Sequence, residues 1–288
     1  MRILLTGAKG FTGRYLTATA QAKGHTVLAL QADLTQPRAV KEEVVALQPS
    51  HVVHLAAISF VGHVDQRSFY DVNLFGTLNL LDALLALDTQ PRSVLLASSA
   101  NVYGNCQASP IPEEQAPAPL NHYGVSKLAM EHMARTYGDR LPVVITRPFN
   151  YTGAGQGASF VVPKLVDHFN RRAPSIQLGD LAVQREFNDV QMVCSAYLQL
   201  LQHGEAGQTY NVCSGQPHTL RHVLDTLTCL TGHEMQVEVN PTFVRAKEVY
   251  RLCGNPAKLH ALLAVQGTAL ANPPLEDTLR RMLTAAGS

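Results

Sequence analysis

Apolar residues fall into two kinds of segment that alternate along the chain. Short continuous apolar runs are typical of strands buried on both faces of a parallel sheet, and they occupy residues 2–6, 25–30, 52–57, 93–97 and 142–146. Between these runs apolar residues recur every three or four positions, which indicates amphipathic helices, at residues 14–24, 37–47, 65–88 and 121–138. The pattern therefore predicts a repeated strand–helix unit over the first half of the chain.

Shorter pieces follow after residue 159. The pattern predicts helices at residues 160–172, 190–204 and 219–231, short strands at residues 176–180, 185–190, 208–215 and 235–239, and two helices at the C-terminal end. Repeated strand–helix units favour an α/β fold with a Rossmann-type doubly wound parallel sheet. The shorter pieces predict a smaller C-terminal α/β lobe.

Composition and charge exclude several classes of protein. The 288 residues are 46% hydrophobic and 16% charged, and the net charge is only +1. The scattered Lys and Arg form no basic stripe, so we expect no nucleic-acid partner. No apolar run reaches the length of a membrane span, and too few apolar residues precede Thr6 for a signal peptide. The five cysteines follow no pairing pattern, so we expect a cytoplasmic protein with reduced thiols and no metal site.

Three glycines stand between the first predicted strand and the first helix. Gly7, Gly10 and Gly13 form a GxxGxxG pattern within TGAKGFTG. At such a turn, glycines let the backbone approach a pyrophosphate, which then lies on the helix N-terminus; a purely structural turn is the alternative. We therefore assign residues 1–150 to a dinucleotide-binding domain, with a return contribution from about residues 182–212, and residues 151–288 mainly to a substrate lobe.

The end of the second strand bears on which dinucleotide binds. An acid at this position binds the ribose 2′-hydroxyl of NAD, whereas a base accommodates the 2′-phosphate of NADP. Gln31 stands near the position, and the helix at 37–47 follows so closely that the second and third strands are compressed. The missing acid favours NADP, with NAD still possible. Arg14 and Arg38 are either phosphate contacts or solvated surface arginines.

A tyrosine and a lysine in NHYGVSK form a candidate acid–base pair. Tyr123 and Lys127 are four residues apart and share one face of the helix at 121–138. An ammonium group favours the phenolate form of a neighbouring tyrosine; a chance surface pair is the alternative. Ser99 follows the apolar run at 93–97, at the carboxyl end of a parallel strand, where α/β sheets bind ligands.

A second candidate cluster is less informative. His51 and His54 are three residues apart on a predicted strand, so their side chains face opposite sides. We interpret both histidines as structural and expect no metal.

Four motifs coincide along the chain: TGAKGFTG, HLAA, SSANVYG and YGVSK. Together they resemble the extended short-chain dehydrogenase/reductase family over nearly the whole chain. The segments HLAAISFVG, RPFNYTGAGQGASFV, REFNDV and GEAGQTYNVCSG are similar to the branch that reduces GDP-4-keto-6-deoxy-D-mannose. The resemblance implies an NAD(P)-dependent oxidoreductase that reduces the C4 ketone of a GDP-linked 4-keto-6-deoxy sugar. Its product would be GDP-D-rhamnose or GDP-6-deoxy-D-talose, used for cell-surface polysaccharide such as lipopolysaccharide.

The resemblance also implies roles for individual residues. Tyr123 would be the catalytic acid/base, Lys127 would lower its pKa and hold the nicotinamide ribose, and Ser99 would hydrogen-bond the C4 oxygen. The implied cofactor contacts, besides Tyr123 and Lys127, are Gly7, Gly10, Phe11, Thr12, Gly13, Asp33, Leu34, Ala56 and Ala57. The implied substrate contacts, besides Ser99, are Asn150, Val161, Lys164, Arg185, Arg245 and Glu248. A guanidinium matches phosphate geometry, with an ordinary salt bridge as the alternative for Arg185 and Arg245.

One position separates the chain from the dehydratases of the same family. Those enzymes carry a carboxylate two residues before the tyrosine of their SxxxYG segment, where this chain has Asn101. An amide cannot act as a base, so we expect no dehydration. Two other functions stay open. One is a nucleotide-sugar 4-epimerase with tightly bound NAD; the other is a nucleotide-binding regulator without turnover, which the intact catalytic set disfavours.

The predicted helices at 65–88 and 121–138 carry more apolar residues than one sheet face needs. Relatives pair these helices in a four-helix bundle, so we expect a homodimer. The alternative is that all of these residues face the sheet.

Overall fold

A six-stranded parallel sheet forms the larger part of the molecule. The structure is a computed structural model and describes residues 1–243 and 249–286. The strands lie in the order β10-β5-β4-β3-β1-β2, and every neighbouring pair is parallel. Their bounds are β1 Arg2–Thr6, β2 Thr26–Ala29, β3 His51–His54, β4 Val94–Ala97, β5 Val143–Pro148 and β10 Thr209–Val212. The predicted Rossmann-type doubly wound sheet is confirmed.

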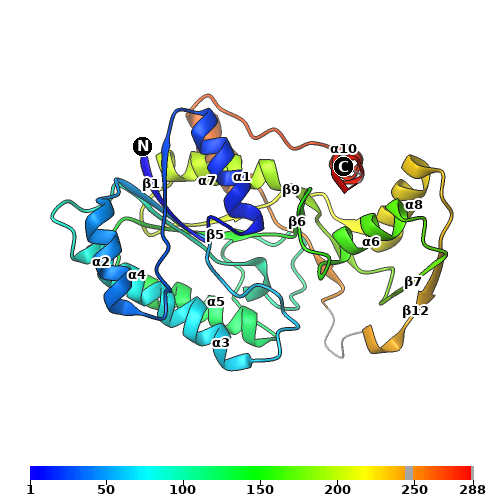
Figure 1. Ribbon diagram of the computed structural model, residues 1–288, viewed down its shortest axis with the longest axis horizontal. Coiled ribbons are helices and arrows are strands. Elements are labelled where there is room, and N and C mark those ends of the chain that lie inside the picture. Colours follow the sequence, from blue (N-terminus) through cyan, green and yellow to red (C-terminus); the bar gives the residue numbers. More distant parts are fainter. Residues whose placement is uncertain (244–248, 287–288) are drawn as a thin grey trace.

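Helices cover both faces of this sheet (Figure 1). One face carries α1 Phe11–Ala22, α7 Val190–His203 and α9 Ala257–Val265; the other carries α2 Pro37–Leu47, α4 Gly76–Leu85 and α5 His122–Arg135. Consecutive strand residues point to opposite faces, so Ile3 and Leu5 join the core under α1 and α7, and Leu4 joins the core under α2 and α4. Burial on both faces explains why the strands are apolar without interruption.

The strand order reverses between β1 and β3. α1 leads from β1 to β2 on one side, and α2 leads back to β3 on the other side of β1. The sequence predicted a compressed region around Gln31. In the structure β2 is the edge strand of the sheet, and the chain enters α2 after only a short loop. Open α/β sheets bind ligands beyond the carboxyl ends of their strands at such a reversal.

The helix predicted at residues 65–88 is interrupted. It consists of α3 Gln66–Tyr70, a π-helical turn η1 Asp71–Phe75, and α4. The turn directs Asn73 inward, where its amide exchanges hydrogen bonds with the backbone of Ile58 and donates to Ser126 Oγ at 3.1 Å. An extra residue in one turn is a common way to aim a polar side chain near a functional site.

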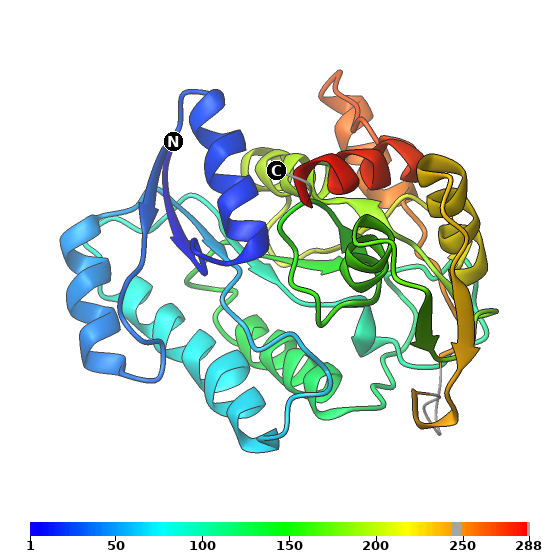
Figure 2. The same ribbon diagram turned by 45° about the vertical axis from the view of Figure 1, so that its right-hand side comes forward.

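A smaller lobe stands beside the sheet (Figures 1 and 2). In it α6 Val161–Asn170, α8 Leu220–Thr231 and α10 Leu275–Ala286 enclose one apolar core with the parallel pair β7 Ser175–Leu178 and β12 Gln236–Val239. A short 3₁₀ turn, η3 Pro241–Phe243, follows β12. The smaller α/β lobe was predicted; the domain boundary at residue 150 stays a prediction.

Short strands join the lobe to the sheet. β8 Gln184–Arg185 pairs with β11 His218–Thr219 and β13 Arg251–Leu252, and β6 Tyr151–Thr152 pairs with β9 Asn188–Asp189. The single strand predicted at residues 185–190 is therefore wrong. It divides at Glu186, whose buried carboxylate accepts hydrogen bonds from the backbone N–H groups of Ser214 and Gly254 at 2.7 and 2.6 Å. In the described ranges no helix is long and apolar enough to cross a membrane.

Candidate active site

The glycine turn between β1 and α1 is held by close backbone contacts. Gly7 has φ +72°, and a Cβ there would lie 2.9 Å from the backbone N of Ala56 after β3. A Cβ on Gly13 would lie 2.1 Å from the carbonyl oxygen of Gly7, whereas one on Gly10 would meet that oxygen at 3.2 Å. Gly7 and Gly13 are thus required for the turn to close, whereas Gly10 faces a less crowded side of the turn.

This turn suits a pyrophosphate. α1 begins at Phe11 with Gly10 as its N-cap, and no described side chain caps its first turn. The N–H groups of that turn point away from the helix at the strand reversal, which is the geometry that binds phosphate. The glycine pattern and its position therefore fit a dinucleotide.

Phe11 and Thr12 bind the start of α1 to the segment after β5. Thr12 Oγ1 lies 2.8 Å from Tyr151 Oη, and the Phe11 ring stacks on the Tyr151 ring at 6.2 Å between centroids. Tyr15 Oη donates to the carbonyl of Ala154 at 2.9 Å. These contacts fix the glycine turn against the segment that also carries Asn150.

The predicted adenosine contacts lie along the loops after β2 and β3. Asp33 Oδ1 accepts from the backbone N and the hydroxyl of Thr35, both at 2.9 Å. Leu34 is buried in the core under α2 and α4, so its side chain is not available to a ligand. Ala56 N donates to Thr6 Oγ1 at 3.1 Å, and Ala57 follows on the same loop.

The end of β2 has an acid that sequence reasoning missed. Glu43, from α2, accepts hydrogen bonds from the backbone N–H groups of Gln31 and Ala32 through both of its oxygens. Of the two candidate arginines, Arg14 donates to the carbonyls of Lys9 and Gly155, and Arg38 forms an exposed pair with Glu42.

Ser99 stands two residues after the end of β4 and caps the 3₁₀ turn η2 Ala100–Val102. It is 5% exposed, and its Oγ accepts from both the backbone N and the side-chain Nδ2 of Asn101 at 3.1 Å. Two donors already point at this oxygen, so its own hydrogen is directed elsewhere. The amide at position 101, which departs from the dehydratase pattern, thus orients the Ser99 hydroxyl.

Tyr123 lies in the first turn of α5, beside Ser99. Asn121 caps the helix through a 2.8 Å bond from Gly124 N, and a Cβ on Gly124 would lie 2.8 Å from the Asn101 carbonyl oxygen. This close approach brings the phenol to the end of β4. Burial raises the pKa of Tyr123, and a hydrogen bond with Ser99 partly lowers it.

Lys127 lies one helical turn further along α5 and is 2% exposed. Its Nζ donates to the carbonyl oxygen of Ala97 at 2.8 Å. Burial lowers the pKa of this ammonium to about 8, and Glu131 partly raises it. Burial is the largest effect on the Tyr123 phenol and holds its pKa above the ordinary value. The lowering of this pKa by Lys127 stays a prediction.

The predicted substrate contacts divide between the two parts of the molecule. Asn150 is exposed at the end of β5, and Val161 opens α6. Lys164 Nζ donates to the Gln177 carbonyl at 2.9 Å and lies 5.1 Å from the centre of the Phe243 ring. Arg185, on β8, donates to the carbonyls of Gln184 and Tyr250 at 2.8 and 3.3 Å. Arg245 and Glu248 lie outside the described residues.

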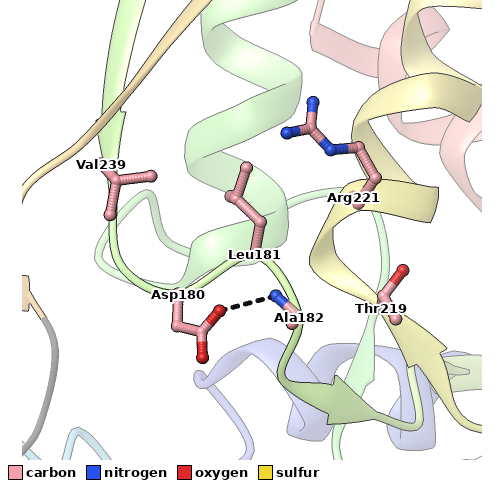
Figure 3. A pocket seen from close by; sticks show the side chains of 6 residues that line it. All are labelled: Asp180, Leu181, Ala182, Thr219, Arg221 and Val239. Atoms are coloured by element: carbon pink, nitrogen blue, oxygen red, sulfur yellow. Dashed lines mark hydrogen bonds between the residues drawn. The ribbon is translucent and has the colours of Figure 1, made fainter.

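A hollow of about 760 Å³ opens in the small lobe (Figure 3). Its lining residues are Asp180, Leu181, Ala182, Thr219, Arg221 and Val239. Leu181 stands in the middle of the group, between Val239 and Arg221, and Asp180 accepts from Ala182 N at 2.8 Å. None of the site residues predicted within the described ranges lines it, so it adds no catalytic group.

Two buried charged residues behind the site were missed from the sequence. Glu131 follows Lys127 by one helical turn, and Arg147 lies on β5 directly after Thr146, near the end of the strand. Charged residues are almost never fully buried unless paired, so an arginine directly after the apolar run at 142–146 was a usable signal. Over residues 1–243 and 249–286, no group of three or more His, Cys, Asp or Glu is placed to hold a metal ion.

Comparison with known proteins agrees with this geometry. The model of the NAD dependent epimerase/dehydratase family matches residues 3–213. The GDP-6-deoxy-D-mannose reductase of Pseudomonas aeruginosa is 39% identical over 275 residues, and the GDP-6-deoxy-D-talose 4-dehydrogenase of Aggregatibacter actinomycetemcomitans is 34% identical over 265 residues, each match covering 90% of both chains. The structure of RMD from Pseudomonas aeruginosa complexed with NADPH has a TM-score of 0.91 at 36% identity, covering 99% of this chain and 98% of that one. The chain therefore belongs to the NAD dependent epimerase/dehydratase family, within the extended short-chain dehydrogenases/reductases that its motifs resemble.

Proposed function

We propose that this protein is an NADPH-dependent reductase of the C4 ketone of a GDP-linked 4-keto-6-deoxy sugar. Its product would be GDP-D-rhamnose or GDP-6-deoxy-D-talose. The observation that carries the proposal is the meeting of Ser99, Tyr123 and Lys127 at the carboxyl edge of the sheet that also holds the glycine turn. The two GDP-6-deoxysugar enzymes among the relatives support this class of substrate.

The acid–base set suits proton donation to a ketone oxygen. The bound reduced nicotinamide supplies the hydride. Burial keeps the Tyr123 phenol protonated at neutral pH, so it can give its proton to the oxygen at C4. The Ser99 hydroxyl, held by Asn101, donates to the same oxygen, and the Lys127 ammonium favours the phenolate that proton transfer leaves behind.

NADPH is the proposed cofactor, since the solved relative holds NADPH. Gly7, Gly10, Gly13, Phe11 and Thr12 would surround the pyrophosphate, and Asp33, Leu34, Ala56 and Ala57 would line the adenosine side. Gln31 carries no charge, and Glu43 beside it uses both oxygens on backbone N–H groups. The uncharged Gln31 favours NADP, whereas the negative charge of Glu43 favours NAD; the NADPH held by the solved relative decides the proposal.

The substrate would extend from Ser99 toward the small lobe. Asn150 and Val161 would contact the sugar, and Lys164 and Arg185 supply cationic groups for the diphosphate. Arg245 and Glu248, by the family resemblance, would complete the GDP contacts. The Asn101 side chain is an amide and cannot act as a base, which supports reduction without elimination of water.

The same residues leave one competing function. A nucleotide-sugar 4-epimerase would use Ser99, Tyr123 and Lys127 with tightly held NAD, and the family model covers epimerases as well. Purified protein that carries NAD and converts its sugar nucleotide without added cofactor would establish the epimerase instead.

We also propose a homodimer, through the helices η1, α4 and α5. Phe75, Val125 and Met133 are 54%, 38% and 42% exposed on these helices, and a second copy would cover them. We place the enzyme in the cytoplasm, on the route to a deoxysugar of lipopolysaccharide or another surface polysaccharide. Its five cysteines are free thiols, which supports a reducing compartment.

Removal of the Tyr123 hydroxyl tests its proposed role as the proton donor. Tyr123→Phe is expected to lower turnover of NADPH and GDP-4-keto-6-deoxymannose by at least a hundredfold, while NADPH still binds. Tyr137→Phe, which removes a buried phenol bonded to Asp82 near the end of the same helix, is the matched control and keeps wild-type turnover. Near-wild-type turnover by purified Tyr123→Phe would refute the proposal.

A further inference from the structure

Glu131 is a buried carboxylate directly behind the acid–base set. It lies on α5, four residues after Lys127, and is 0% exposed. An isolated ionised carboxylate is very costly to bury, so it persists only where hydrogen bonds and opposite charge compensate it. The groups that bind the Glu131 carboxylate therefore indicate its role.

Three groups from three elements meet this carboxylate. Ser98 Oγ donates to Oε1 at 2.6 Å from the end of β4. Arg147, on β5, donates from Nε to Oε1 at 2.9 Å and from Nη2 to Oε2 at 2.7 Å, a bidentate pair. Arg135, on α5, approaches Oε2 at 3.4 Å from the half-exposed side. The carboxylate thus joins α5 to the carboxyl ends of β4 and β5.

Lys127 and Glu131 hold two consecutive residues of β4's end. The ammonium binds the carbonyl oxygen of Ala97 at 2.8 Å, and the carboxylate binds the hydroxyl of Ser98. Ser99 comes next in the chain. One face of α5 therefore fixes the strand end that delivers the Ser99 hydroxyl to Tyr123.

We propose that Glu131 is a positioning residue whose buried negative charge stabilises the Lys127 ammonium and locks the end of β4 against α5. The inference rests on the proposed reductase function for its catalytic meaning. Its electrostatic part rests on the position of two buried, oppositely charged residues one turn apart on α5, together with the upward effect of Glu131 on the Lys127 pKa. Glu131 does not touch the reacting atoms. It acts through Lys127 and Ser98.

The charged and titratable groups around Lys127 set the sign of the effect. Glu131 raises the pKa of Lys127, whereas burial lowers it. His54, on β3, is neutral because burial and Lys127 lower its pKa to about 3. The Tyr123 phenol is also neutral. Arg147 lies on the other side of the Glu131 carboxylate, to which it donates two hydrogen bonds. Removal of the Glu131 charge is therefore expected to lower the Lys127 pKa and leave more of that lysine neutral at pH 7.

Glu131→Gln and Ser98→Ala separate charge from hydrogen bonding. Both variants lose a hydrogen bond at the same place, but only the first loses the charge. The direct readout is the NMR titration of ¹³C-labelled lysine, with the Lys127 signal assigned by its loss in Lys127→Met. Glu131→Gln is expected to lower the Lys127 midpoint by about one pH unit, and Ser98→Ala to leave it in place. The alkaline limb of the kcat/KM profile moves with the midpoint.

A double variant covers the case in which Glu131→Gln fails to fold, because that change leaves Arg147 buried without its carboxylate. Glu131→Gln/Arg147→Met removes the whole pair and is expected to lower the midpoint in the same direction but by less, because the loss of the Arg147 cation also removes a repulsion on the Lys127 ammonium. An unmoved midpoint in a folded variant that lacks the carboxylate overturns the proposal, as does an equal shift in Ser98→Ala. Failure of the reductase function would appear separately, as wild-type protein that consumes no NADPH while the Lys127 midpoint still depends on Glu131.

Discussion

Lys127→Met is expected to make the protein more stable at neutral pH while abolishing its activity. Lys127 is 2% exposed, and burial lowers its pKa from 10.5 to about 8. At 1.36 kcal/mol per pKa unit, holding this charge inside costs the folded state about 3 kcal/mol at pH 7. Methionine has a similar length and no charge, but it loses the hydrogen bond to the Ala97 carbonyl, worth about 1 kcal/mol. The net gain is about 2 kcal/mol.

The gain depends on pH in a definite direction. Between about pH 8 and 10.5 the unfolded wild-type chain binds a proton at Lys127 that the folded chain has released. Wild-type stability therefore rises with pH across this window, and the variant lacks that rise. The advantage of Lys127→Met shrinks above pH 8 and is gone by about pH 10.

Urea unfolding at pH 7 and pH 10 measures both effects. Lys41→Met, on the exposed side of α2, is the control for replacing a lysine by methionine and is expected to change stability by less than about 0.5 kcal/mol. A Lys127→Met protein that is less stable than wild type at pH 7, or equally more stable at both pH values, would refute the reasoning.

Three further predictions follow from the same contacts. Gly13→Ala places a Cβ 2.1 Å from the Gly7 carbonyl oxygen, so it is expected to lower the free energy of unfolding by about 3 kcal/mol and to abolish NADPH binding. Gly10→Ala is the control and is expected to cost under about 1 kcal/mol. Equal stability of the two variants in urea would contradict this. His54 is buried and its pKa is lowered from 6.5 to about 3, so stability falls as the pH drops from 6.5 toward 3; His54→Asn is expected to flatten this fall in acid titrations followed by circular dichroism, and an unchanged slope would show that other groups cause it. Phe75→Glu, at an exposed apolar position on η1, is expected to convert the proposed dimer to a monomer in light scattering, and a wild-type monomer would remove the proposed interface.

The main elements follow from the sequence because burial dictates them. A strand covered on both faces must be apolar throughout, so β1 and β4 could be predicted within about one residue. α2 begins at Pro37, which has a fixed backbone angle suited to the first helical position, and its predicted bounds are confirmed. Gly7, Ser99 and Tyr123 each stand at the end of such an element, so the set meets at one edge of the sheet.

What could not be predicted depends on tertiary contacts. The π-helical turn at Asp71–Phe75 exists because Asn73 reaches Ile58 and Ser126, which are distant in sequence. The division of the segment at 185–190 depends on where Glu186 finds its backbone donors. The raised pKa of Tyr123 depends on how deeply the phenol is buried, and residue spacing carries no information on burial depth.

Stoichiometry of cofactor use tests the central claim most directly. Purified protein is mixed with GDP-4-keto-6-deoxymannose and NADPH, absorbance at the reduced nicotinamide band is followed, and NMR identifies the configuration at C4 of the product. The account predicts one NADPH oxidised per sugar reduced, with GDP-D-rhamnose or GDP-6-deoxy-D-talose formed and no turnover without added cofactor. Conversion of a sugar nucleotide into its C4 epimer, with NADPH untouched and NAD bound to the protein, would contradict it.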